Sequence, residues 1–367
     1  MKRVSVYIKG GQNSPNYYRI YQYTNRIKDL HFIFRTMTSN KMHDKYMPLS
    51  KKPVYIRAFV LVIMYFRILY YLIQDCRYKP STIIITRRVI NKIMPWPYKY
   101  MLKKLSVEIP IIWDFDDDII YGKEVSQDTF NFYAKISDTI FCTHNGLKNL
   151  IPKQYQHKVV LLATTDGDIY QLYNDKVKQR RLETFKDTLK IIWVATSVNI
   201  PHLLNIAPFL DKYAKIIKES YGKSVELFVV CNAPLNYNFK NILLKNIKWS
   251  RGAAINGILE SHIGIMPLMD NRYSKGKGGF KLVQYLSAGL PCIGSDVGFN
   301  KEVIDPCCGR LVKGEVEWGN ALLYLADLYN WEQCSDNAYS RWLNKFSFID
   351  NFNIWKDTLR RITNDNK

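Results

Sequence analysis

The sequence contains few cysteines, and none of them is spaced for a metal site or a disulfide framework. The 367-residue chain has seven, an odd number; no CxxC pair occurs, and Cys307 and Cys308 are adjacent. This scatter argues against a disulfide-stabilised scaffold and a zinc module, and it favours a reducing cytoplasm. The six histidines also lack neighbours that would suggest metal ligation or a catalytic triad, and we interpret His262 as structural.

The sequence also lacks an uninterrupted apolar run long enough to cross a bilayer. The N-terminal MKRVSVYIKGG has too short an apolar stretch for a signal peptide and predicts a first strand. The most apolar segment, residues 56–75, is interrupted by Arg67, whereas a membrane span needs ~18–20 apolar residues. We expect a largely buried helix here. The alternatives are a helix in the membrane interface, favoured by the basic residues before it, and a true span.

Acidic residues are scarce relative to basic ones, and this imbalance calls for an anionic partner. The chain has 53 Lys and Arg against 32 Asp and Glu, a formal net charge of +21. A phosphorylated substrate, an anionic membrane face and nucleic acid could each be that partner. The positive charge is spread along the chain and no nucleic-acid-binding motif occurs, so we expect no nucleic-acid partner.

Short runs of β-branched residues alternate with helical patterns along the whole chain. A chain of this length exceeds the size at which one core stops growing, so two domains of roughly 150–200 residues are expected. The alternation predicts an α/β fold with a parallel, doubly wound, Rossmann-like sheet in each domain. The expected strands are residues 4–8, 31–35, 82–86, 109–113, 139–142, 158–162, 189–194, 225–230, 263–266 and 291–294.

The polar, charge-dense stretch at residues 173–187 predicts a linker between the two halves. We therefore expect an N-terminal domain at 1–178, a C-terminal domain at 188–345 and a terminal helix at 346–367 that packs back on the N-terminal domain. That last segment places five large apolar residues on one helical face: Phe348, Phe352, Trp355, Leu359 and Ile362. Domains of this type bind ligands at the carboxyl ends of their strands, and we expect a central cleft there.

The stretch KGKGGFKLVQYLSAGLPCIGSDVGFNKEV, residues 275–303, carries the strongest functional signal. It follows an expected strand, and Gly278 and Gly279 let the backbone approach an anion just before a helix that begins near Phe280. The free N–H groups of the helix and the nearby cations favour a phosphate group. These cations are Arg272, Lys275, Lys277 and Lys281. A plain turn is the alternative interpretation.

This stretch resembles the donor-binding signature of the retaining glycosyltransferases of family 4, the "glycosyl transferases group 1" type with the GT-B fold. SPNYYRIYQY near residue 14, IPIIWDFDDDI near 109, LKIIWVATSVNIPHL near 189 and EWGNAL near 317 resemble further landmarks. The resemblance implies transfer of a sugar from a nucleoside-diphosphate sugar to a hydroxyl of a carbohydrate or lipid-linked acceptor, with retention and without a metal cofactor. It further suggests polysaccharide or glycolipid synthesis in the cytoplasm, at times on the inner face of the membrane.

The chain departs from the family motif at both of its glutamates. Their positions are Gly276 and Gln284 here, and a Gln can bind ribose hydroxyls but carries no charge. The other donor-side residues follow from the resemblance and from their places after strands. They are Gly10, Gly11, Thr196, Ser197, Gly278, Gly279, Phe280 and Glu302, besides the cations named above. A helix cap by Ser197 or Asn199 is an alternative for that loop.

Four carboxylates, Asp114, Asp116, Asp117 and Asp118, follow one expected strand. We favour binding of acceptor or donor-sugar hydroxyls by Asp114, Asp116 or Asp117; in the resembling family Asp116 takes the place of a His that faces the donor sugar. A second interpretation is an Asp-x-Asp metal site of the GT-A fold, made by Asp116 and Asp118. A third is structural: they cap the next helix or pair with the arginines at 87 and 88.

If the resemblance holds, the catalytic residues are Lys281, Lys277 and Asp116, with Lys275 as the alternative to Lys277 in assisting Lys281. The cations would stabilise negative charge on the leaving diphosphate, and that phosphate would take the acceptor proton in a same-face attack. Arg19, at the start of the first helix, is assigned to the acceptor; a surface position is its alternative. A protein that binds sugar nucleotide without catalysis is a further alternative, because Gln284 lacks the carboxylate.

Overall fold

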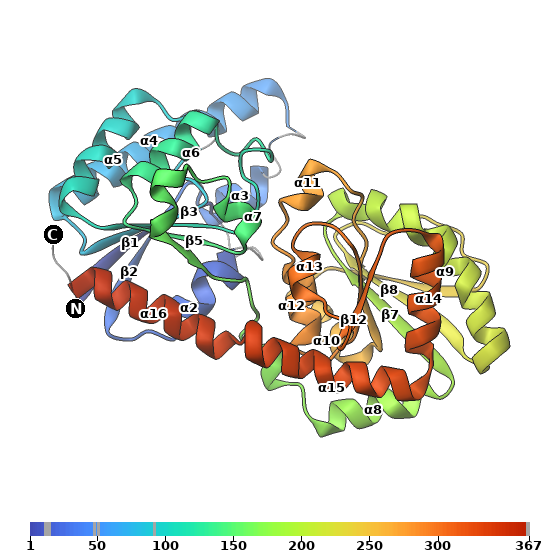
Figure 1. Ribbon diagram of the computed structural model, residues 1–367. Helices are drawn as coiled ribbons and strands as arrows, with labels where there is room; N and C mark the ends of the chain where they lie inside the picture. The colour runs from blue at the N-terminus through green and yellow to red at the C-terminus, as the bar shows by residue number, and fades with distance from the viewer. Residues whose placement is uncertain (11–15, 47–48, 50–51, 91–92, 365–367) are drawn as a thin grey trace. The chain divides into compact units, whose positions relative to one another are not determined.

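The computed structural model describes residues 1–10, 16–46, 49, 52–90 and 93–364, and the chain divides into two compact units (Figure 1). The N-terminal unit consists of Met1–Ala163 together with Asp350–Lys367, and the C-terminal unit is Thr164–Ile349. Each contains one six-stranded sheet in which every strand pair is parallel. The expected α/β class with two doubly wound domains is confirmed.

The sheet of the N-terminal unit has the strand order β2-β1-β3-β4-β5-β6. Its strands are β1 Lys2–Ile8, β2 Leu30–Thr36, β3 Thr82–Thr86, β4 Ile111–Phe115, β5 Thr139–Cys142 and β6 Val159–Leu161. The helical segments are η1 Tyr17–Tyr21, α2 Gln22–Thr24, α3 Asn40–Tyr46, α4 Val54–Tyr78, α5 Trp96–Glu108, α6 Gln127–Ile136, α7 Asn145–Lys148, η3 Lys153–Lys158 and α16 Phe348–Asn364. Helices α4, α5 and α6, each of which connects two strands of this sheet, lie on one face of it, and α2 and the C-terminal helix α16 lie on the other (Figure 1).

The sheet of the C-terminal unit has the order β12-β11-β10-β7-β8-β9. Its strands are β7 Thr188–Val194, β8 Ser224–Cys231, β9 Ile242–Lys248, β10 Ile263–Met266, β11 Cys292–Ser295 and β12 Gly309–Val312. The helical segments are η4 Ile169–Gln171, α8 Asp175–Phe185, η5 Ser197–Asn199, α9 Ile200–Tyr221, α10 Arg251–Glu260, α11 Arg272–Lys275, α12 Phe280–Leu286, α13 Asn300–Val303, α14 Glu315–Ala326 and α15 Leu328–Lys345. The strand order reverses between β7 and β10, which makes this pair the topological switch point.

The charge-dense stretch at 173–187 is not a linker but contains helix α8 of the C-terminal unit. Most positions of α8 are polar, but one face of the helix is buried and is formed by Val177, Arg181 and Phe185. The guanidinium of Arg181 is 1% exposed and donates hydrogen bonds to the carbonyls of Ile258, Leu259 and Ala288. The boundary between the units therefore lies at residues 163 and 164, before the charged stretch.

Helix α16 packs within the N-terminal unit from residue 350 onward, although it is the last segment of the chain. Trp355 is buried, and its ring stacks on Tyr23 with centroids 5.5 Å apart. The ammonium of Lys2 donates to the carbonyl of Thr363, which fixes the far end of the helix beside β1. Two members of the apolar face read from the sequence, Phe352 and Trp355, thus contact α2, and Trp355 also contacts Phe32 of β2. Phe348 belongs to the C-terminal unit and stacks on Tyr170.

The apolar segment at 56–75 forms most of α4, and the structure buries only one of its faces. The buried positions are Val60, Met64, Ile68, Leu72 and Asp75. The expectation of a largely buried helix is therefore wrong for the opposite face, which is also apolar and is exposed. By length and composition α4 is long and apolar enough to cross a membrane, yet only 22% of its most apolar stretch is buried.

Candidate functional site

The glycine- and lysine-rich segment, residues 267–279, follows the carboxyl end of β10, and we call it the loop after β10. It lies beside the carboxyl end of β7. These two strands pair directly, so the loops that follow them belong to one edge of the sheet. The ammonium of Lys277 donates a hydrogen bond to the side-chain oxygen of Asn199, which follows β7. The sequence analysis placed candidate residues in both loops, and the structure brings the two loops into contact at the switch point.

The loop after β7, residues 195–199, is hydrogen-bonded to Asn232, which follows a third strand, β8. The side-chain oxygen of Asn232, directly after β8, accepts from the backbone N–H of Ser197 at 2.7 Å. The Asn232 amide in turn donates to the Ser197 hydroxyl at 3.1 Å, and Asn199 donates to the Thr196 hydroxyl at 3.0 Å. Neither Thr196 at the start of η5 nor Asn199 at the start of α9 makes a side-chain cap. These polar side chains therefore bond within the loop and to Asn232, and they do not cap the helix that follows.

The backbone of the glycine loop is shaped by a left-handed residue at the start of α12. Gly279 has φ +59°, and a Cβ atom there would lie 2.6 Å from the Phe299 ring. The following turn is equally tight, because a Cβ on Gly298 (φ +56°) would lie 3.0 Å from the Lys275 backbone. The loop after β10 and the turn after β11 are thus packed against each other, and both glycines are required by this contact.

We expect Gly279→Ala to destabilise the protein more than Gly222→Ala does. Both glycines are left-handed, at φ +59° and +69°, but no atom lies within 4 Å of a Cβ at Gly222. Gly222→Ala should lower the free energy of unfolding by roughly 1–2 kcal/mol from backbone strain alone. Gly279→Ala adds the collision with Phe299, about 1–3 kcal/mol more. Urea denaturation measures both; equal losses would contradict the packing described for the loop.

Lys281 is the central cation of the site and belongs to a small buried network. It is partly buried at the start of α12, and its ammonium lies 3.5 Å from the side-chain oxygen of Gln284. The amide nitrogen of Gln284 donates to a carboxylate oxygen of Asp166 at 2.7 Å. Asp166 also accepts from the backbone N–H groups of Asp168 and Ile169. Gln284 thus bridges the carboxylate and the lysine.

Burial lowers the pKa of Lys281 to about 8, an effect that the Asp166 carboxylate partly opposes. Burial likewise raises the pKa of Asp166, against the N–H groups that it accepts from. The neighbouring His202 accepts from the backbone N–H of Met269 at 3.1 Å, and burial, with Lys277 nearby, lowers its pKa. Burial is thus the largest influence on the pKa of each of these three groups.

The other donor-side candidates around this centre range from exposed to buried. Lys275 is exposed and pairs with Asp270 at 2.8 Å, and Arg272 is exposed in the same short helix. Phe280 is partly buried, with the Lys281 ammonium 4.9 Å from its ring centre, while Gly278 is buried. Glu302 lies on α13 with its side chain largely exposed, and the desolvation of its carboxyl by neighbouring groups raises its pKa.

In the N-terminal unit, the aspartates after β4 are engaged by the protein itself. Arg87 donates to Asp116 at 2.9 Å, to Asp117 at 2.6 Å and to Glu124 at 2.7 Å. Asp118 accepts from two backbone N–H groups in the turn that follows. The pairing with Arg87 agrees with the structural interpretation, in which these aspartates pair with the arginines at 87 and 88. An acceptor or a donor sugar would reach Asp116 or Asp117 only by sharing them with Arg87.

Arg19 and Asp114 form an ion pair in the interior of the N-terminal unit. Both side chains are 1% exposed, and Arg19 also donates to the carbonyl of Leu162 at 2.7 Å. Burial raises the pKa of Asp114, and the adjacent Arg19 opposes that rise. Arg19 is therefore not a surface residue, and an acceptor would have to break this pair to contact either group.

The first glycine after β1 has a packing role in the structure. A Cβ on Gly10 would lie 2.2 Å from the carbonyl oxygen of Thr38, so no larger residue fits without moving the backbone. Gly11 lies outside the described residues. The proposed donor contact of this turn stays a prediction.

The described residues hold no group of three or more His, Cys, Asp or Glu side chains placed to bind a metal ion. The two-sheet fold also differs from the single nucleotide domain that the GT-A alternative required. His262 accepts from the backbone N–H of Lys190 at 2.9 Å, and burial lowers its pKa to about 3, which agrees with a structural role.

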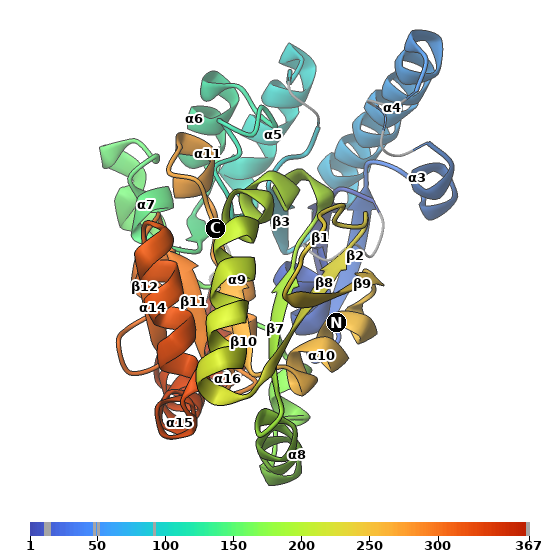
Figure 2. The same ribbon diagram turned by 90° about the vertical axis from the view of Figure 1, so that its right-hand side faces the viewer.

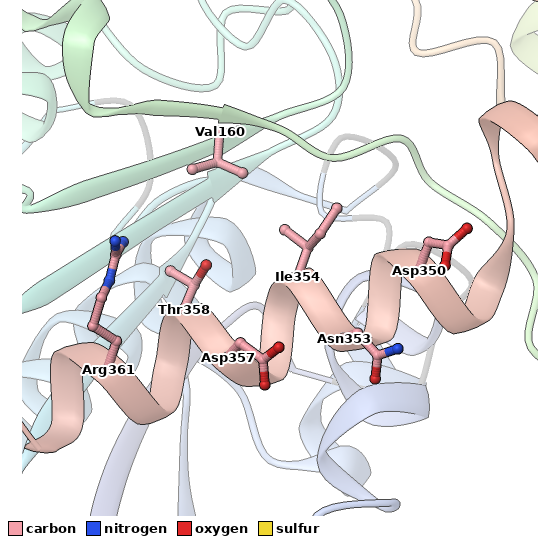
Figure 3. A pocket seen from close by; sticks show the side chains of 7 residues that line it. All are labelled: Val160, Asp350, Asn353, Ile354, Asp357, Thr358 and Arg361. Atoms are coloured by element: carbon pink, nitrogen blue, oxygen red, sulfur yellow. The ribbon is translucent and has the colours of Figure 1, made fainter.

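A separate surface pocket of about 540 Å³ lies between β6 and α16 in the N-terminal unit (Figure 3). It is lined by Val160, Asp350, Asn353, Ile354, Asp357, Thr358 and Arg361. Ile354, Thr358 and Arg361 point toward β6 in this view. Two carboxylates and one guanidinium do not form a phosphate site, and we assign the pocket no role.

Sequence reasoning missed Asp166, Asn232 and His202. Asn232 directly follows β8, so the rule that selected Thr196 after β7 would also have selected it. Asp166 lies in a segment assigned to the wrong domain, and its contact with Gln284 joins residues 118 positions apart. No local pattern indicates that contact.

Comparison with known proteins identifies the fold. A scan against protein-family models and a search of curated proteins found no match. Among solved structures, HepE of Anabaena in complex with UDP-glucose is similar with TM-score 0.65 and 9% identity, over 98% of this chain and 100% of that one. Sucrose-phosphate synthase from Thermosynechococcus elongatus gives 0.62 and 10%, over 99% of both chains. UDP-GlcNAc 2-epimerase from Neisseria meningitidis, bound to UDP-GlcNAc, gives 0.57 and 13%, over 98% and 100%.

These likenesses extend over the full chain, and they show that this protein has the GT-B fold. Identities of 9–13% carry the fold and not the activity, and the neighbours include both transferases and an epimerase.

Proposed function

We propose that the protein is a retaining glycosyltransferase that binds a nucleoside-diphosphate sugar at the loop after β10. One observation carries this proposal: two lysines and two glycines, Lys277, Lys281, Gly278 and Gly279, are gathered at the switch point of the C-terminal sheet. Backbone N–H groups and ammonium groups in such a place suit a diphosphate. The HepE structures are described as complexes with UDP and with UDP-glucose, which supports the same ligand class here.

In this proposal the cations act on charge that grows during the reaction. The bond between the anomeric carbon and the phosphate oxygen breaks while the acceptor oxygen bonds to the same face of that carbon. The acceptor proton passes to the departing phosphate. We propose that no metal ion is required, because the lysines of the loop stabilise the charge on the diphosphate. Lys281 and Lys277 stabilise the diphosphate charge, and Gln284 positions Lys281 through the contact at 3.5 Å. Asp116 stays a candidate for the donor sugar.

The pH dependence should report on Lys281. Its charged form is the active one in this account, and a pKa of about 8 means that the charge is lost as pH rises through that value. The pH dependence of kcat/KM reports the pKa values of the free enzyme, so we expect kcat/KM to fall as the pH rises through about 8. The bound diphosphate raises the pKa again, so kcat should persist to higher pH. A kcat/KM that stays level through pH 9–10 would count against a charged Lys281.

The proposed function is tested by a panel of nucleotide sugars in two assays. Thermal unfolding identifies the donor, because a ligand at 100 times its Kd stabilises by ~2.7 kcal/mol. Incubation of that donor with carbohydrate and lipid-linked acceptors then shows whether a glycoside and a nucleoside diphosphate form, and whether the anomeric configuration is retained. Binding without turnover would indicate a non-catalytic protein, and an isomerised sugar nucleotide would indicate an epimerase. Both results overturn the proposal.

Synthesis of a surface polysaccharide or glycolipid in the cytoplasm is the role we propose for this activity. The net charge of +21 suits acceptors that carry phosphate, such as lipid-linked intermediates.

A further inference from the structure

Helix α4 exposes a continuous apolar stripe, which we call the α4 outer face. Successive members are three or four residues apart, so they share one side of the helix. They are Tyr55 (74% exposed), Phe59 (57%), Val62 (52%), Phe66 (68%), Tyr70 (57%) and Ile73 (53%). A water-exposed helix of a globular protein normally turns polar residues outward, and a helix that is apolar all round is normally buried. The α4 outer face therefore needs an apolar partner.

The opposite face anchors α4 in the N-terminal core, which rules out a span of the bilayer by this helix in the folded protein. Asp75 is 1% exposed and accepts from Tyr7 at 2.7 Å, from Ser5 at 3.0 Å and from Arg35 at 2.6 Å. Extraction of α4 into a bilayer would break this buried ion pair and expose the sheet. The outer face can meet a membrane only with the helix lying along its surface.

The neighbouring helix α5 enlarges the surface. The two helices are joined by Tyr65, which donates to the carbonyl of Ile93 at 2.8 Å and accepts from Tyr98 at its own carbonyl, also at 2.8 Å. They cover the same face of the sheet, so their outer sides look the same way (Figure 1). On α5 and just before it, Ile93, Trp96, Tyr100 and Val107 are between 56% and 74% exposed.

The α4 helix is also longer than the sheet that it covers. Its 25 residues extend about 37 Å at 1.5 Å per residue, whereas the five residues of β3 extend about 17 Å. One end of α4 reaches past the strands in Figure 2. Residues 54, 55 and 57–59 at its N-terminus are all exposed. This end is free to enter an apolar layer without disturbing the core.

The charges on the two helices favour an anionic surface. Arg57 and Arg77 on α4 and Lys103 and Lys104 on α5 are exposed. Among the described residues of α4 and α5 the only carboxylates are Asp75, which is buried, and Glu108, which pairs with Lys79. Exposed Trp and Tyr beside Lys and Arg are typical of segments in the membrane interface, where the rings meet acyl chains and the cations meet lipid phosphates.

We propose that the α4 outer face, with the exposed side of α5, docks the N-terminal unit on an anionic lipid bilayer, with α4 lying in the headgroup region. The surface uses no residue of the loop after β10, so its test does not depend on the proposed function.

Vesicle flotation tests this proposal with the full-length protein. Wild type should float with vesicles of phosphatidylcholine and phosphatidylglycerol in equal parts, and much less with phosphatidylcholine alone. Phe59→Glu/Phe66→Glu should weaken binding at least about tenfold, since two large apolar groups leave the interface. Lys103→Glu/Lys104→Glu should weaken binding to the anionic vesicles and lower its salt sensitivity. The control is Tyr329→Glu, on a residue 70% exposed on α15, which should bind like wild type.

Two outcomes overturn the docking proposal. One is wild type that stays with the unbound fraction on anionic vesicles at low salt. The other is a Phe59→Glu/Phe66→Glu variant that floats as well as wild type; if wild type is then a dimer in sedimentation and this variant a monomer, the face joins two copies of the chain. Circular dichroism confirms that each variant is folded.

Discussion

Replacement of Lys281 by alanine is expected to lower kcat/KM about 10²–10³-fold while the protein stays folded. The lysine contributes a charge aimed at the leaving diphosphate, and loss of one such group typically costs ~3–4 kcal/mol of transition-state stabilisation. The side chain is partly buried and contacts Gln284 at 3.5 Å, a long hydrogen bond, so its removal leaves little of the fold unsupported. The measurement is steady-state transfer with the donor found by thermal unfolding.

The matched control is Lys275→Ala, four residues before Gly279 in the same loop. Lys275 is exposed and held by Asp270 at the surface, where an ion pair contributes little. We expect at most a few-fold change in rate from this variant. Gln284→Ala should fall between the two, because it removes the group that positions Lys281 without removing the charge. Near-normal turnover of Lys281→Ala, or equal losses for Lys275→Ala, would refute the assignment.

Arg19→Ala is expected to lower the free energy of unfolding by about 3–5 kcal/mol, because it leaves the buried Asp114 carboxylate without its partner. Both side chains are 1% exposed. Without Arg19 the pKa of Asp114 rises further, since only burial remains as its main influence. The deficit should therefore shrink at low pH, where Asp114 is protonated and its burial costs less. Urea denaturation at two pH values measures both effects.

A double replacement distinguishes a structural pair from an acceptor site. Arg19→Met/Asp114→Leu removes both charges and should recover much of the stability lost in Arg19→Ala. If the pair instead binds acceptor, Arg19→Ala would remain as stable as wild type and its KM for acceptor would rise. That result would restore the role that the sequence suggested for both residues.

Much of the fold could be predicted from the sequence because most of its inner strands contain runs of buried β-branched and aromatic residues. All ten expected strands are present with ends shifted by no more than two residues. The strands that the sequence analysis missed, β9 and β12, are both at an edge of their sheet. In β9 the exposed Leu243 and the lysines at 245 and 248 break the apolar run. An edge strand is covered on fewer sides, so its sequence carries a weaker signal.

The misassigned linker has a different cause. Helix α8 is polar at most positions, and its buried Arg181 satisfies its donors with carbonyl groups from two distant segments of the chain. A charged residue normally indicates solvent, and nothing near residue 181 reveals those carbonyls. Helix α4 shows the converse: its apolar sequence indicated burial, yet only 22% of its most apolar stretch is buried.

The location of the candidate site could be predicted from the sequence, but the side-chain contacts of its residues could not. Glycines before a helix and lysines around them are local features, and the structure places them beside the β7 loop as the topology requires. The contacts of Lys281 with Gln284, and of Gln284 with Asp166, depend on tertiary packing. The sequence of the Asp114–Asp118 cluster suggested a binding site for sugar hydroxyls. In the fold, Arg19 pairs with Asp114, and Arg87 pairs with Asp116 and Asp117.

A crystal structure of the protein with a nucleoside diphosphate, UDP or GDP, would show directly where the donor binds. We expect the diphosphate oxygens to lie within hydrogen-bonding distance of the Lys281 ammonium and of backbone N–H groups between Lys277 and Phe280. A diphosphate bound elsewhere, for example at the pocket between β6 and α16, with the loop after β10 unoccupied, would contradict this expectation.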